Sequence, residues 1–232
     1  MRVLTWNLFH GRSLPPAPGA LASQFATMLG GWEWDVALLQ EVPPWWPAML
    51  ARAAGAQQRR ALTSRNALLP LRRALTVRSA ELMKSNGGGC NAMLARHPIA
   101  EHRSVLLRRW PERRVAQLVR LADGVCVVNF HGSARVALAE QELARLWELA
   151  VSFAGGEPLV LGGDLNLREP IAPLGAGAVH LARRDVDHLF ALGMHVDGSP
   201  ELLDRRVVLR HGTVELSDHL PLRAAVSPRG GF

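Results

Sequence analysis

The sequence predicts a mixed α/β (α+β) fold in which two β-sheets stack face to face and helices cover their outer faces. Two observations support this prediction. Short apolar segments bounded by turn residues outnumber the segments with helical spacing, and the two kinds are interspersed along the chain. The 232 residues contain no internal repeat and no long block of charge. We therefore expect a single domain over residues 1–232.

Three segments have the spacing of amphipathic helices. Residues 21–29 carry apolar side chains at helical intervals and end at a pair of glycines. Residues 45–54 are closed by Gly55. The longest helix is expected over about residues 135–153, with Ser133 as its N-cap and leucines forming most of one face.

The predicted strands are short and mostly apolar. Residues 35–41 have the continuous apolar centre of a strand buried on both faces. Residues 116–121 and 125–130 flank an Ala-Asp-Gly turn, which predicts a hairpin. Further strands are expected at residues 3–6, 91–95, 158–161, 187–190, 207–209 and 222–226.

Composition limits the classes of function. The chain is 48% hydrophobic and 20% charged, which excludes a disordered protein, and no apolar run approaches the roughly 20 residues of a membrane-spanning helix. The N-terminus lacks the layout of a signal peptide and two cysteines cannot staple a scaffold, so we expect a cytoplasmic monomer without stable membrane insertion. The net charge is +7 and Lys84 is the only lysine. Arginine suits phosphate oxygens, although genome-wide composition bias explains the same excess.

Several predicted strands end in an acid, an amide or an imidazole where an apolar residue would be ordinary. Carboxylate and amide oxygens are the ligands that Mg²⁺ and Mn²⁺ prefer, and histidines move protons or stabilise charge near neutral pH. Each residue alone also fits a turn former or a cap. If the strand ends meet at one edge of the sheets, they form a single cleft. These residues are Asn7, Glu41, Asn129, His131, Asp164, Asn166, Asp187, Asp218 and His219.

Taken in order, seven stretches resemble the endonuclease/exonuclease/phosphatase superfamily, which includes pancreatic-type deoxyribonucleases, abasic-site exonucleases, sphingomyelinases and inositol-polyphosphate phosphatases. The resemblance runs from residue 3 to about residue 226. It implies a four-layer α/β/β/α sandwich of the deoxyribonuclease type, with the active site at one edge of the paired sheets. The stretches are TWNL (5–8), LQE (39–41), NAMLARHPI (91–99), NFH (129–131), GDLN (163–166), VDHLF (186–190) and SDHLP (217–221).

The resemblance also implies a metal site for Mg²⁺ or Mn²⁺. Glu41 would be the principal ligand, with Asn7 and Asp218 near the same ion. Phe9 stands where several nucleases of this kind place a second acidic residue, so we expect one metal ion rather than two.

Five further residues are implied to act on the phosphate. Asp164 would orient or deprotonate the attacking water, and Asn166 would hold the phosphate or the water. His219 would stabilise charge on the scissile phosphate, with Asp187 fixing its imidazole. His131 would lie near the leaving-group oxygen as a candidate general acid. This scheme is coherent for in-line attack, because the metal and the imidazolium neutralise the charge of the transition state.

One departure from the family pattern narrows the branch. The abasic-site enzymes typically carry a tyrosine near the Asn-x-His stretch, and this chain has no tyrosine. The NFH stretch is closer to the deoxyribonucleases and sphingomyelinases. Gly132 also replaces the usual leucine after the histidine.

The leading hypothesis is a metal-dependent phosphodiester hydrolase with nucleic acid, DNA or RNA, as its substrate. A phosphatase or phosphodiesterase for lipid headgroups or small phosphorylated molecules is the alternative. A catalytically inactive phosphate-binding module would have lost at least one of Glu41, Asp164, Asn166 and His219, and all four are present.

Two further patterns keep two interpretations each. Trp45 and Trp46 fit packing better than stacking on a base. The arginine pairs 72–73, 108–109 and 113–114 fit a basic rim that follows phosphates and fit a solvated surface equally well.

Overall fold

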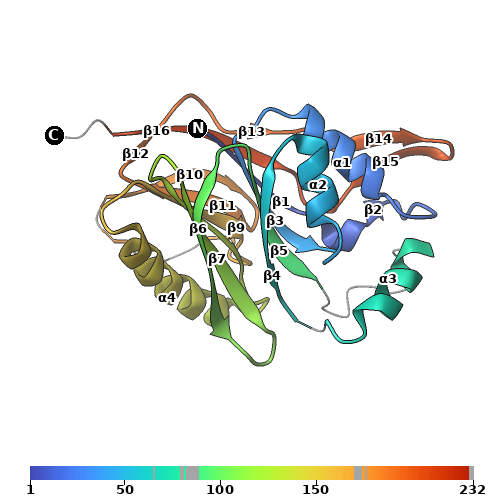
Figure 1. Ribbon diagram of the computed structural model, residues 1–232, viewed down its shortest axis with the longest axis horizontal. Helices are drawn as coiled ribbons and strands as arrows, with labels where there is room; N and C mark the ends of the chain where they lie inside the picture. The colour runs from blue at the N-terminus through green and yellow to red at the C-terminus, as the bar shows by residue number, and fades with distance from the viewer. Residues whose placement is uncertain (65, 79–80, 82–88, 170–173, 176, 230–232) are drawn as a thin grey trace.

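The computed structural model describes residues 1–64, 66–78, 81, 89–169, 174–175 and 177–229, and it has four layers (Figure 1). Two β-sheets stack on each other, helices α1 (Ala22–Gly31) and α2 (Pro47–Ala54) cover one outer face, and helix α4 (Val136–Ala154) covers the other. Helix α3 (Leu69–Arg78) contributes no buried side chain and lies outside these layers. The predicted α/β/β/α sandwich is confirmed.

The first sheet has the strand order β12-β16-β1-β3-β5-β4, with β13 also pairing with β16. The second sheet has the order β10-β11-β9-β8-β7-β6, and β14, β15 and β2 form a small third sheet. The first sheet contains β1 (Arg2–Asn7), β3 (Val36–Val42), β4 (Gln57–Leu62), β5 (Cys90–Ala95), β12 (Met194–Val196), β13 (Glu201–Leu202) and β16 (Leu222–Pro228). The second contains β6 (Ile99–Arg108), β7 (Arg114–Leu121), β8 (Cys126–His131), β9 (Leu159–Asp164), β10 (Ala178–Arg184) and β11 (Asp187–Leu192). The third contains β2 (Ser13–Leu14), β14 (Arg206–Leu209) and β15 (Gly212–Leu216), and a short 3-10 helix η1 (Phe9–Gly11) follows β1.

The central strands are apolar on both faces because both faces are covered. In β3, Leu38 packs between the two sheets while Leu39 packs under α1 and α2. In β9, Val160 packs between the sheets while Leu161 packs under α4. The two-residue period of a strand thus divides each continuous apolar run between two cores.

Parallel strand pairs bring the polar strand ends to one edge. β1 is parallel to β3 in the first sheet, and β8 is parallel to β9 in the second, so the carboxyl ends of all four lie together. Below this edge the side chain of Gln40 donates to Oδ1 of Asn129 across the two sheets at 2.8 Å. Asn129 in turn donates to the backbone carbonyl of Ala92 at 2.9 Å. Asn129 therefore ties the sheets together beneath the edge.

The predicted helices and strands are found, with one error at a helix start. Arg135 rather than Ser133 is the N-cap of α4 and makes no side-chain capping bond. Ser133 instead directs its hydroxyl and its backbone N–H to the buried carboxylate of Glu142, at 2.7 and 2.9 Å. Ser133 therefore donates to the carboxylate of Glu142 within α4 instead of capping the first turn of the helix. None of the described helices is long and apolar enough to span a membrane.

Candidate active site

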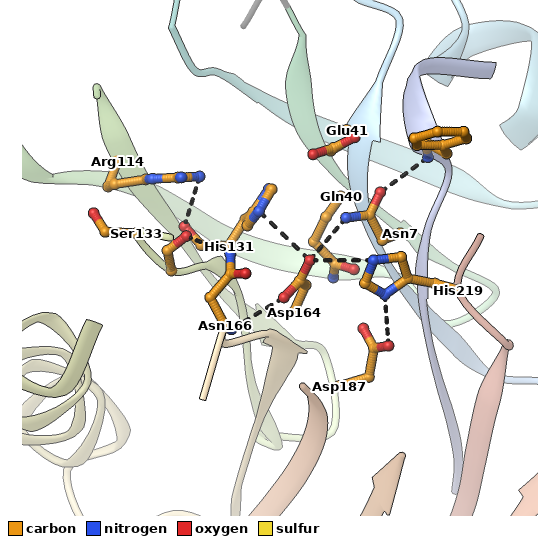
Figure 2. Close-up of polar contacts among 12 residues, drawn as sticks. Asn7, Gln40, Glu41, Arg114, His131, Ser133, Asp164, Asn166, Asp187 and His219 are labelled. Atoms are coloured by element: carbon orange, nitrogen blue, oxygen red, sulfur yellow. Dashed lines mark hydrogen bonds and ion pairs between the residues drawn. The ribbon is translucent and has the colours of Figure 1, made fainter. Parts of the chain in front are cut away.

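The edge where β1, β3, β8 and β9 end carries a pocket of about 300 Å³. It brings together side chains that are up to 212 residues apart in the sequence, from Asn7 to His219. Two predicted residues lie outside the pocket: Asp187 lies directly behind His219 (Figure 2), and Asn129 joins the sheets beneath it. The predicted residues that line the pocket are Asn7, Glu41, His131, Asp164, Asn166, Asp218 and His219.

Asp164 is the centre of the site and is almost fully buried. Its Oδ2 accepts a hydrogen bond from the amide of Asn7 at 2.8 Å and lies 3.5 Å from Nε2 of His131 and 3.7 Å from Nε2 of His219. Its Oδ1 accepts the backbone N–H of Asn166 at 3.0 Å. Because donors surround it on several sides, this carboxylate is held in one orientation toward the pocket.

The approach of two backbones places Asp164. Gly163 has a φ of +142°, and a Cβ there would lie 1.8 Å from the carbonyl oxygen of Phe130 in β8. Gly132 makes a similar approach, since its Cβ would lie 2.4 Å from the carbonyl oxygen of Leu165. The space at position 132 has no room for the leucine that is usual there. Only glycine at both positions lets the ends of β8 and β9 come together with His131 opposite Asp164.

Asn166 is fixed by its backbone as well as by its side chain. Its φ is +54°, a left-handed conformation that asparagine tolerates better than most residues. Its side-chain amide donates to the carbonyl of Gly132 at 3.0 Å. This bond uses one of the two side-chain N–H groups of Asn166, a residue that lines the pocket.

His219 forms a charged pair with Asp187. Its Nδ1 donates to Oδ2 of Asp187 at 2.7 Å, which leaves Nε2 directed at the pocket. Burial alone would lower the pKa of His219, but the hydrogen bond and the charges of Asp187 and Asp164 outweigh it and raise the pKa to about 9. The imidazole is therefore protonated at neutral pH. Ser217, with a φ of +71°, accepts the backbone N–H of His219 and donates to the carbonyl of Asn7, so it holds this loop against β1.

Glu41 leaves the regular ladder of β3. Its φ is +50°, and the pairing of β3 with β5 shifts register at this position, as at a β-bulge. Burial, followed by the charges of Asp164 and Asp218, raises the pKa of Glu41 to about 7, while His219 and the amide of Asn7 oppose this rise. Nε2 of His10 lies 3.1 Å from its carboxylate. Glu41, Asp164 and Asp218 together carry more negative charge than the nearby imidazolium of His219 neutralises.

These donors fit a divalent cation. Glu41, Asp164 and Asp218 are hard oxygen donors whose mutual repulsion a cation would relieve. Oδ1 of Asn7 accepts the backbone N–H of Phe9 at 2.9 Å and keeps a second lone pair. Among the described residues, donor atoms of Asp164, Asp187 and His219 also lie within 4.8 Å of one another. In that group, however, Nδ1 of His219 and Oδ2 of Asp187 are already hydrogen-bonded to each other. The cation therefore fits better on the side of the pocket that holds Glu41.

The imidazole of His131 has a pKa far below its usual value. Burial, and the charge of Arg114 after it, lower the pKa of His131 to about 3, although Asp164 opposes the shift. A guanidinium nitrogen of Arg114 lies 3.5 Å from the backbone carbonyl of His131 and ties β7 to the end of β8. A neutral imidazole can still donate one hydrogen bond from Nε2 into the pocket.

Among the pocket residues that sequence reasoning missed, His10 and Arg114 contact predicted site residues. His10 follows Asn7 by three residues, and a turn with positive φ at His10 brings it onto Glu41, a geometry that has no spacing signal. Arg114 was expected only as part of a surface pair, yet it is buried and lines the pocket. Trp46 packs in the core under α2, as the packing interpretation predicted, and Trp45 is packed against the same core.

Comparisons with known proteins agree on one fold. The endonuclease/exonuclease/phosphatase family matches residues 4–219, whereas no curated protein matches the sequence. TDP2 from Caenorhabditis elegans superposes with a TM-score of 0.70 at 15% identity, over 96% of this chain and 74% of that chain. An endonuclease/exonuclease/phosphatase protein from Beutenbergia cavernae gives 0.64 at 19% identity, over 99% and 72%. TDP2 of D. rerio complexed with single strand DNA product gives 0.66 at 14% identity, over 98% of both chains.

Proposed function

We propose that this chain, which belongs to the endonuclease/exonuclease/phosphatase family, is a divalent-metal-dependent phosphodiester hydrolase that acts on nucleic acid. One observation carries the proposal. A buried carboxylate, Asp164, lies between an imidazolium and a second imidazole, next to a cluster of acidic oxygens. This arrangement supplies an anion to position water and a cation to receive negative charge within one small pocket.

Glu41 would hold the metal ion, assisted by Asn7 and Asp218, and we propose Mg²⁺ or Mn²⁺ because all three ligands are oxygen donors. When bound, the ion supplies Lewis-acid stabilisation of charge on the phosphate oxygens. The rise of the pKa of Glu41 to about 7 has the same origin as this affinity, since burial and neighbouring carboxylates make the free anion unfavourable.

Asp164 would position the attacking water. Its two oxygens are held by Asn7 and by the backbone of Asn166, so a water hydrogen-bonded to it has a fixed direction. The water would attack phosphorus and give a proton to Asp164, while the bond to the leaving oxygen opens on the opposite side and that oxygen takes up a proton. His219 donates from Nε2 to a phosphate oxygen, and Asp187 keeps that imidazole charged and oriented.

His131 and Asn166 would complete the contacts on the phosphate. His131 is neutral and donates a hydrogen bond, and it can pass on a proton only once the negative substrate raises its pKa. Asn166 presents its amide from the adjoining wall. We propose that these two residues lie near the leaving-group oxygen, because both line the pocket beside Asp164 (Figure 2).

Nucleic acid is the proposed substrate class on two grounds. The chain carries a net charge of +7 with nearly all positive charge on arginine. A structural neighbour, TDP2 of D. rerio, was crystallised with a single strand DNA product. Phosphomonoesters and lipid headgroup diesters are the competing substrates in the test below.

The test is a panel of hydrolysis rates at equal enzyme concentration. The substrates are bis(p-nitrophenyl) phosphate, p-nitrophenyl phosphate, sphingomyelin in detergent micelles, a single-stranded DNA oligonucleotide and plasmid DNA, each with Mg²⁺, Mn²⁺ or chelator. We expect metal-dependent cleavage of the diesters, with DNA preferred over the monoester. Asp164→Asn should lower kcat by at least about 100-fold, as expected for loss of a residue that positions the nucleophile.

Glu148→Gln is the matched control, because it removes one exposed carboxylate on α4 without touching the pocket. Its rates should equal those of the parent. Preference for the monoester or the lipid would refute the nuclease assignment. Hydrolysis that survives Asp164→Asn would refute the assigned site.

A further inference from the structure

An exposed tryptophan lies beside the catalytic pocket. Trp110 is in the turn between β6 and β7, and 82% of its surface is accessible. The large hydrophobic residues of the described chain are otherwise mostly packed into three cores. An indole this exposed leaves most of its ring surface open to a ligand.

Trp110 lines a groove that continues from the catalytic pocket. The groove has a volume of about 640 Å³ and runs between the β6–β7 turn, the end of β4 and the start of α4. Thr63, Ser64 and Arg113 line both this groove and the catalytic pocket. A chain whose phosphate lies at Asp164 can therefore extend directly onto Trp110.

The two arginine pairs of this turn divide their roles. Arg108 is bound to the buried carboxylate of Glu142, and Arg114 is bound to Glu112 and to the carbonyl of His131. Their neighbours Arg109 and Arg113 are exposed, and neither forms an ion pair with any described residue. The structure thus separates one structural arginine in each pair from one that is available to a ligand.

The groove is positively charged overall. Arg109, Arg113 and Arg135 line it, and Arg135 also forms no ion pair within the described part of the chain. Glu112 is the acidic residue of the lining, and its charge is neutralised by Arg114. Three available guanidinium groups around one indole match a ligand that alternates negative charge with flat rings.

We propose that this groove is a subsite for the nucleotides that flank the scissile phosphate in a single-stranded substrate. Trp110 stacks on one base, and Arg109, Arg113 and Arg135 contact the neighbouring phosphates. A base in a duplex is already stacked on its neighbours, whereas an unpaired base offers its face to the indole. The subsite deepens the proposed function and rests on it for the position of the scissile phosphate.

The first test compares a substrate that reaches the groove with one that ends in the catalytic pocket. Stacking of one base on an aromatic side chain contributes about 1–3 kcal/mol, equivalent to about 5- to 150-fold in affinity. Trp110→Ala should therefore lower kcat/KM on a single-stranded 12-mer at least about 5-fold more than on bis(p-nitrophenyl) phosphate, mainly through KM. Trp110→Phe should restore most of the loss, because it retains an aromatic face. Equal losses on the two substrates, or none on the 12-mer, would overturn the subsite.

The second test measures binding without turnover. Fluorescence anisotropy of a labelled 12-mer in chelator should show a weaker Kd for Trp110→Ala and for Arg109→Ala, and less salt dependence for Arg109→Ala. Arg52→Ala, which removes one exposed charge on α2, is the matched control and should bind as the parent does. A duplex of the same sequence should lose less affinity than the single strand on Trp110→Ala, and an equal loss would overturn the stacking assignment.

These two tests separate the subsite from the proposed function. Tryptophan-dependent binding of the 12-mer by a protein that hydrolyses no diester would support the subsite and refute the hydrolase. Diester hydrolysis with no effect of Trp110→Ala on the 12-mer in either test would refute the subsite alone. That last outcome is also the one expected if Trp110 contacts another protein instead.

Discussion

Replacing Asp187 by asparagine should move the alkaline limit of activity. In the parent protein, Oδ2 of Asp187 accepts a hydrogen bond from Nδ1 of His219 at 2.7 Å and supplies much of the negative charge that keeps the imidazole protonated. Asparagine preserves the size of the side chain and the capacity to accept a hydrogen bond, but it removes the charge. Burial of His219, which lowers its pKa, is then opposed only by the other carboxylates of the pocket.

The size of the effect follows from the two pKa values. With a pKa of about 9, His219 carries its proton at neutral pH and loses it as the pH rises through 9. At pH 8 such a group is about 90% protonated, whereas a histidine at its ordinary pKa of 6.5 is about 3% protonated. If only the imidazolium stabilises the transition state, Asp187→Asn should lower the rate about 30-fold at pH 8 and much less at pH 6. A bound metal ion lowers both pKa values, so the difference between the two proteins is the quantity to measure.

The assay is kcat/KM for bis(p-nitrophenyl) phosphate from pH 5 to pH 10 at saturating metal. Glu148→Gln, which removes one exposed carboxylate on α4, is the control and should keep the profile of the parent. The reasoning is refuted if Asp187→Asn lowers the rate equally at every pH. It is also refuted if the alkaline limb stays in place, because His219 would then hold its proton without Asp187.

Three more predictions concern the metal site and the scaffold around it. Metal binding should weaken as the pH falls below about 7, because the proton that Glu41 takes up there competes with the cation. Calorimetric titration of Mn²⁺ should give a Kd at pH 6 that is at least about 10-fold higher than the Kd at pH 8. Gly163→Ala should lower the free energy of unfolding by several kcal/mol more than Gly155→Ala does, as measured by denaturant unfolding. Both glycines have positive φ, but only a Cβ at position 163 meets a carbonyl oxygen, at 1.8 Å. Equal free energies for the two variants would contradict the required close approach of β8 and β9. Arg108→Met should lower the free energy of unfolding in urea by about 3 kcal/mol, because the carboxylate of Glu142 would stay buried without its cation. A decrease below about 0.5 kcal/mol would show that the ion pair contributes nothing to stability.

Most of the fold could be predicted from the sequence because its central elements are buried on both faces. β3 and β9 are continuous apolar runs, and α4 has a regular apolar face, so their type follows from local pattern. The residues of the long strand β6 are mostly exposed or half-buried, and several carry charges, so the strand gave no apolar signal. Its place in the sheet depends on pairing with β7, which is information that no local window contains.

Much of the pocket lining could be predicted from the sequence, but its geometry only in part. Asp164 and Glu41 end or interrupt apolar strands, and His219 lies in the loop between two strands, so these polar residues stand out in the sequence. His10 reaches Glu41 through a backbone turn that no side-chain pattern encodes. The depression of the pKa of His131 arises from burial and from Arg114 on a different strand, so it too required the assembled fold.

The arginine pairs show the same limit. In the sequence, residues 108–109 and 113–114 are alike, and both a phosphate rim and a solvated surface fit them. Only the position of Glu142 on α4 and of Glu112 in the turn assigns Arg108 and Arg114 to internal ion pairs. Because both members of each pair are arginine, the sequence could not indicate which one is free to bind a ligand.

The most direct test of the central claim is the rate of hydrolysis of bis(p-nitrophenyl) phosphate as a function of Mn²⁺ concentration, for the parent, Glu41→Gln and Glu148→Gln. The account predicts a rate near zero in chelator and a saturable rise with metal in the parent. Glu41→Gln should need at least about 10-fold more metal for half saturation, and Glu148→Gln should match the parent. A rate that does not depend on metal, or the same half-saturating concentration in all three proteins, would contradict the assignment of Glu41 and the metal-dependent chemistry built on it.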